Sequence, residues 1–122
     1  MAIPPPDMQS RVEVLTEFAS EAAERGEHMF YVRIPASVEP LKRGELFEDP
    51  LQQALAHAAL GEVTGGGSQL AENDSIAYCG VDVVVNDRLR GLELIRSTLR
   101  QLQVPVGTVI EEFIPAWQEL SL

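Results

Sequence analysis

The 122-residue chain has little cysteine, little positive charge and no long apolar run. Its single cysteine, Cys79, cannot form an intrachain disulfide, so nothing requires an oxidising compartment. Nine basic and nineteen acidic side chains give a net charge of −10, which argues against a nucleic-acid binder and against an anionic membrane surface. No apolar run approaches the roughly 18 residues of a membrane-spanning helix. The first residues lack the pattern of a secretory signal, and we expect a cytoplasmic protein.

The charge is unevenly distributed. Residues 61–87 contain no basic side chain, whereas residues 88–107 are basic because of their arginines. Two interpretations of this basic stretch are open. It is a solvated helix face neutralised by nearby acids, or it is a contact site for an anion or an acidic partner through Arg88, Arg96 and Arg100.

Apolar residues at helical spacing predict three helices. The first runs from about residue 8 to 25, with Asp7 or Ser10 as its cap and a capping-box pattern that starts at Ser10. The second begins at Asp49 as N-cap, with Pro50 at the first helical position. The third follows the cap Asn86-Asp87, and its predicted buried stripe consists of Leu89, Leu92, Ile95, Leu99 and Leu102.

Four segments have the character of strands: residues 28–34, 62–70, 76–85 and 108–114. Three consecutive glycines, Gly65 to Gly67, interrupt the second of these, which predicts a bulged strand at a sheet edge. Residues 71–75 have the composition of a turn.

After the first helix, the order β-α-β-β-α-β resembles the ferredoxin-like plait, a four-stranded antiparallel sheet with two helices on one face. We therefore expect one α+β domain over residues 1–122. It comprises an N-terminal extension and helix (1–26), the plait (27–115) and a C-terminal tail (116–122). The first and third strands are expected at the centre of the sheet, and the second and fourth at its edges.

The sheet face away from the two helices is predicted to be unusually apolar. It would carry Met29, Tyr31, Ile76, Tyr78 and Val84. Such a patch marks an interface or a ligand site. Three explanations are open: the N-terminal helix folds back over the face, two subunits pack sheet to sheet, or the face forms part of a ligand cleft.

A candidate ligand surface lies on this same face. Tyr78, Gly80 and Asp82 alternate along one side of the third strand, Tyr31 can join them from its neighbour, and the bare backbone at Gly66 could approach a ligand. The alternative is that Tyr78 packs beneath the N-terminal helix and Asp82 faces solvent.

No motif supports catalysis. Cys79 is expected in the core, the two histidines have no metal-ligand spacing, and Glu111-Glu112 has no partner carboxylate at a defined spacing. We expect no metal and no cofactor, and an enzyme is the least favoured class.

The sequence thus favours a non-catalytic protein-interaction or regulatory domain, self-associating as a homodimer through a sheet face or edge. Its acidity suits a basic protein partner, as in an inhibitor or immunity-type protein. The remaining alternative is a small-molecule sensor that uses Tyr31, Tyr78, Gly80 and Asp82.

Overall fold

A five-stranded antiparallel sheet forms the centre of the computed structural model, which describes residues 3–70 and 76–122. The strands are β1 (His28–Ile34), β2 (Gly61–Leu70), β3 (Ile76–Val85), β4 (Val109–Glu112) and β5 (Gln118–Leu120), in the order β2-β3-β1-β4-β5. The prediction of four strands is wrong, because the tail adds β5 beside β4. For the same reason β4 is not the edge strand that we expected.

The edge position and the bulge predicted for the glycine-rich strand are both confirmed. β2 pairs with β3, and their register shifts between Val63 and Gly65. The predicted turn at residues 71–75 lies outside the described residues.

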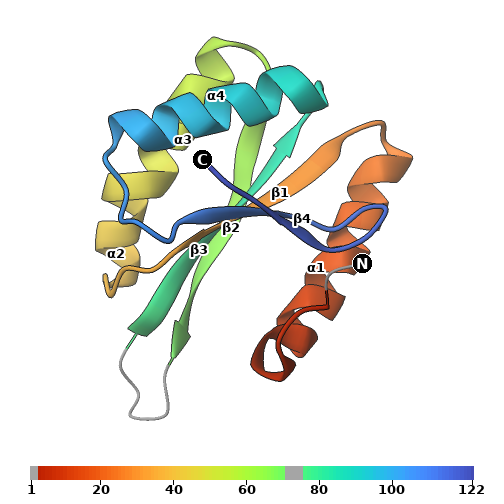
Figure 1. Ribbon diagram of the computed structural model, residues 1–122. Coiled ribbons are helices and arrows are strands. Elements are labelled where there is room, and N and C mark those ends of the chain that lie inside the picture. The colour runs from red at the N-terminus through yellow and green to blue at the C-terminus, as the bar shows by residue number, and fades with distance from the viewer. Residues whose placement is uncertain (1–2, 71–75) are drawn as a thin grey trace.

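Helices cover both faces of the sheet. These are α1 (Gln9–Glu24), preceded by the 3-10 turn η1 (Pro6–Met8), then α2 (Pro40–Arg43), the π-helical turn η2 (Gly44–Glu48), α3 (Asp49–His57) and α4 (Arg88–Gln101). Figure 1 shows α3 and α4 on one side of the sheet and α1 on the other. None of the described helices is both long and apolar enough to cross a membrane.

The larger core lies between the sheet and the pair α3 and α4. The alternating residues of β1 and β3 that were predicted to face these helices are fully buried there: Phe30, Val32, Ile34, Val81, Val83 and Val85. They pack against leucines of α3 and against the apolar stripe of α4. Because side chains alternate between the two faces of a strand, β1 and β3 each direct one apolar face toward α3 and α4.

The second core explains the apolar opposite face. Helix α1 packs its buried residues Val12, Leu15, Ala19 and Ala22 against Met29, Tyr31 and Val84 of the sheet, and Phe113 and Trp117 complete the cluster. Of the three explanations for this face, the fold-back of the N-terminal helix is the one that the structure shows.

Two predicted helix starts are wrong. Ser10 does not cap α1, because the helix already begins at Gln9 and its N-cap Met8 makes no side-chain cap hydrogen bond. Asp49 is not an N-cap either, because the helical run begins nine residues earlier at Pro40. Pro50 has no N–H to donate to the preceding turn, and the wider π-turn η2 stands immediately before it.

The predicted stripe of α4 is wrong at its first position. Leu89 is 71% exposed, and Gly91 is buried in the helix face that meets the sheet. A Cβ at Gly91 would lie 2.6 Å from Cβ of Val85, so the missing side chain allows the helix to approach β3 closely.

Replacing Gly91 by alanine is expected to destabilise the protein by about 1–3 kcal/mol through overpacking, although alanine is the better helix former. The matched control is Gly44→Ala, since Gly44 is also helical and a Cβ there meets only the end of the Glu48 side chain at 3.9 Å. Urea denaturation of both variants measures the difference. Equal stability of the two variants would contradict the close approach of α4 to β3.

Candidate functional site

The carboxylate of Glu111 on β4 is fully buried and is bound by charged side chains. It accepts hydrogen bonds from Arg11 at 3.2 and 3.0 Å, from Arg33 at 3.0 Å and from the indole N–H of Trp117 at 2.8 Å. Arg33 also pairs with the more exposed Glu119 of β5. This buried-charge cluster joins α1, β1, β4 and the C-terminal segment.

Arg11 is also held by aromatic rings. Its guanidinium carbon lies 4.5 Å from the ring centre of Tyr31 and 5.6 Å from that of Tyr78, within the range of cation–π attraction. Burial alone would lower the pKa of Arg11, but the hydrogen bond and charge of Glu111 outweigh it and raise the pKa. Burial raises the pKa of Tyr31, so that both groups keep their ordinary protonation states at neutral pH.

The structure brings together four of the five residues predicted to form a ligand surface. Tyr31 lies opposite Asp82 in the sheet, next to Gly80, and Tyr78 packs on the second core. The space over Gly80 is occupied by the Tyr31 side chain, because a Cβ at Gly80 would overlap its hydroxyl group. This arrangement does not favour a ligand at Gly80, whereas Tyr78 lies beneath α1 as in the alternative interpretation.

Gly66 lies apart from this group. It pairs with Val81, and a Cβ at Gly66 would come within 2.7 Å of a carboxylate oxygen of Glu48 from η2. Val81 and η2 belong to the opposite side of the sheet, where α3 and α4 pack. The structure therefore separates Gly66 from the Tyr31 surface.

Asp82 lines a groove between α1 and the sheet edge at β2. The groove has a cavity of about 210 Å³, with an apolar part formed by Phe18, Met29 and Val84. Its polar part includes Glu21, Thr64 and Arg25, and the charge of Arg25 is paired with Glu27. Burial raises the pKa of Asp82, the charge of Arg11 acts against this, and the charge of Glu48 adds to it. The α1–β2 groove thus holds a partly desolvated carboxylate beside apolar surface.

The predicted basic patch is engaged within the chain. Arg88 binds Glu112 through Nε at 2.7 Å and Nη2 at 2.8 Å. Arg96 donates to the backbone oxygen of Ser121 at 2.8 Å, and Arg100 donates to that of Leu122. These arginines fix β4 and the C-terminal residues beside α4. Arg88 binds an acidic side chain, as neutralisation by nearby acids requires, whereas Arg96 and Arg100 bind backbone oxygens.

Glu112 is stabilised as a carboxylate. Burial alone would raise the pKa of Glu112, but hydrogen bonds from Arg88 and from Gln118, the latter at 2.8 Å, hold it below its ordinary value. The charge of His28 acts in the same direction. The neighbouring carboxylates Glu111 and Glu112 therefore face opposite sides of the sheet and bind different arginines.

The residues considered for catalysis or metal binding do not converge. Cys79 is fully buried, as predicted, and its sulfur donates to the carbonyl of Ala36 at 3.3 Å. Within residues 3–70 and 76–122, no group of three His, Cys, Asp or Glu side chains is placed to hold a metal ion.

Comparison of the chain with family models, curated proteins and solved structures finds no match.

The sequence interpretation missed two features of the site. It did not select Arg11 or Glu111, although Glu111 lies between Val109 and Phe113 on one side of an apolar strand. It also did not identify the groove beside Phe18, which is 52% exposed although Leu15 and Ala19 of the same helix are buried.

Replacing Glu111 by glutamine is expected to destabilise the protein by about 3–5 kcal/mol, because two largely buried arginines lose their shared counter-charge. Glu119→Gln is the matched control: it also contacts Arg33 but is 40% exposed, and we expect a loss of less than about 1 kcal/mol. Chemical denaturation at pH 7 measures both. A small loss in Glu111→Gln would show that the cluster does not hold α1.

The lowered pKa of Glu112 predicts a pH dependence of stability. Its ionised form is favoured in the folded state, so its contribution is present above the ordinary pKa of 4.5 and is lost as the pH falls through the lower folded value. Glu112→Gln should be less stable by about 2 kcal/mol at pH 7. Its stability should also fall less steeply below pH 4.5 than that of the unmodified protein. The exposed Glu93→Gln serves as control and should retain the original pH profile.

Proposed function

We propose that this chain is a non-catalytic protein-interaction domain that binds a basic protein segment along β2 and the adjoining α1–β2 groove. The observation that carries the proposal is the sheet edge. In the described part of the chain β2 pairs with β3 only, while α1 covers one sheet face and α3 and α4 cover the other. An unpaired strand offers backbone hydrogen bonds to an incoming strand, and a sheet face packed under helices does not.

The groove beside this edge supports a basic partner. Phe18, Met29 and Val84 offer apolar surface to the methylene stem of a lysine or arginine, and Asp82 offers a carboxylate to its charged head. A cation placed there lowers the pKa that burial has raised, which means that binding stabilises the ionised Asp82. The net charge of −10 adds long-range attraction for the same partner.

Two further aspects belong to the proposal. The order β2-β3-β1-β4, with α3 and α4 on one face, supports a ferredoxin-like plait to which α1 and β5 are additions. The cytoplasm remains the proposed location on composition grounds.

A symmetric homodimer in which the β2 edges of two copies pair is the second candidate. The unpaired edge favours it, and the negative charge of both copies opposes it. Salt distinguishes the two. Screening should strengthen an association of two acidic copies and should weaken a complex with a basic segment.

The test uses two synthetic ten-residue peptides, one alternating lysine with threonine and one alternating glutamate with threonine. We expect the lysine peptide to shift the amide NMR signals of residues 61–67 in a saturable way that weakens with salt, and the glutamate peptide to have no effect. Asp82→Asn should weaken binding about tenfold, in line with the loss of a charged hydrogen bond. Asp49→Asn, an exposed position on α3, should bind normally.

Measuring the stability of Asp82→Asn distinguishes a lost binding contact from unfolding of the variant. Because burial raises the pKa of Asp82, removing its charge should leave the folded state as stable as before or slightly more stable at pH 7. Weaker binding by Asp82→Asn then reflects the lost contact and not unfolding. Equal binding of both peptides, or no shift at β2, would contradict a basic partner. Light scattering over a range of concentrations and salt decides the homodimer.

A further inference from the structure

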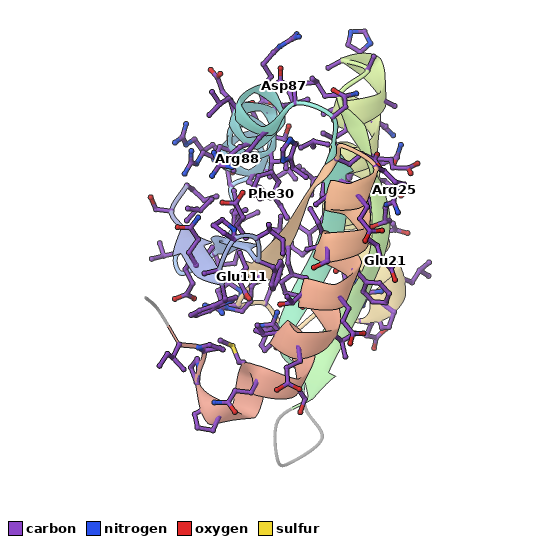
Figure 2. All side chains as sticks on the ribbon, turned by 90° about the vertical axis from the view of Figure 1, so that its right-hand side faces the viewer. Glu21, Arg25, Phe30, Asp87, Arg88 and Glu111 are labelled. Atoms are coloured by element: carbon purple, nitrogen blue, oxygen red, sulfur yellow. The ribbon has the colours of Figure 1, made fainter. Side chains whose placement is uncertain are left out.

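A second cavity, of about 450 Å³, lies on the other border of α1 from the β2 groove. It opens between the C-terminal half of α1, the start of β1 and the segment that follows β4. In Figure 2, Arg88 marks this border of α1, and Glu21 and Arg25 mark the border next to the groove. Its volume falls in the range of small-molecule sites, about 300–1,000 Å³.

The walls of this cavity differ in character. One wall is apolar and consists of Ala19 and Ala23 of α1, Met29 of β1, and Ile114 and Pro115. Ala19, Ala23 and Pro115 are small or rigid, and Ala23 is exposed, so this wall is open to solvent. Such a surface suits a short hydrocarbon group.

The opposite wall is polar and is formed by His28, Arg88, Glu112 and Gln118. The carboxylates of this cavity already have hydrogen-bond or ion-pair partners, whereas a donor group of Arg88 has none within the described part of the chain. Glu112 accepts three hydrogen bonds, two from Arg88 and one from Gln118. The other carboxylate of the lining, Glu27, is paired with Arg25 at 2.8 Å. An incoming cation would therefore find no unpaired carboxylate on this wall.

Arg88 is the donor with spare capacity. It binds Glu112 through the edge formed by Nε and Nη2, and no other hydrogen bond of its guanidinium is found among the described residues. A guanidinium has five N–H groups, and its end-on edge, Nη1 with Nη2, matches a second carboxylate. The side chain is 37% exposed, so this edge remains accessible while Glu112 fixes the orientation of the plane.

We propose that this cavity binds a small monocarboxylic acid. The carboxylate lies on the end-on edge of Arg88, with His28 as an additional polar neighbour, and the hydrocarbon part lies against the apolar wall. Amino acids are excluded as the preferred class, because their ammonium group has no open carboxylate to meet. The cavity shares Met29 with the α1–β2 groove but none of its polar lining residues, and this proposal does not depend on the proposed protein partner.

Three probes of equal chain length test the proposal: hexanoate, hexan-1-ol and hexylamine, each titrated into the full chain and followed by amide NMR shifts. We expect saturable shifts with hexanoate at residues 19–29 and 112–118. The alcohol should bind at least about tenfold more weakly, since it lacks the charge that pairs with the guanidinium. Equal or tighter binding of hexylamine, or no saturable shift with hexanoate, overturns the proposal.

Two variants locate the binding. Ala23→Leu fills the apolar wall from an exposed position and should abolish hexanoate binding, whereas Ser20→Leu, also exposed on α1 but outside the cavity, should bind normally. Arg88→Lys keeps a positive charge for Glu112 but loses the two-pronged edge, and we expect binding to weaken about tenfold. Arg96→Lys is its control on the same helix. Unchanged binding in Ala23→Leu would place hexanoate elsewhere and refute the site.

Discussion

The buried carboxylate of Glu111 sets the arrangement of everything on the second face of the sheet. It takes hydrogen bonds from α1, from β1 and from the C-terminal segment at once, through Arg11, Arg33 and Trp117. Placing a charge in a protein interior is unfavourable unless its hydrogen bonds are complete, so these three partners are held in a narrow set of positions. The apolar contacts of α1 stabilise its packing on the sheet but are non-directional. The hydrogen bonds to Glu111 fix the position and orientation of the helix.

Once α1 is fixed, its two long borders become the places where another molecule can reach the protein. One border faces the open strand β2 and contains Asp82, and the other faces the segment after β4 and contains Arg88. We propose opposite charge preferences for the two, because Asp82 is a carboxylate that burial disfavours and Arg88 is a guanidinium with unused donors. A single helix laid across a sheet thus borders two cavities, and we propose a recognition site of different charge for each.

An element or site residue could be predicted from the sequence where the interactions that determine it are between residues close together in the chain. The bounds of β1 follow from alternation that ends at Pro35, and the structure agrees with them. β5 was missed because a three-residue strand is too short to show a period. The Asp49-Pro50 pair was misread because a proline suits the first turn of a helix but is also tolerated after a π-turn. Glu111 gives no local signal of its partner, since Arg11 is 100 residues away.

The 100-residue separation of Arg11 and Glu111 has a consequence for folding during synthesis of the chain. α1 is synthesised before β4, and the carboxylate that orients it is added 100 residues after Arg11. At a synthesis rate of about 5–20 residues per second, α1 waits on the order of 5–20 seconds for its anchor. During that interval Val12 and Leu15 can meet apolar partners on β1, but α1 lacks the carboxylate of Glu111 that fixes its position on the sheet.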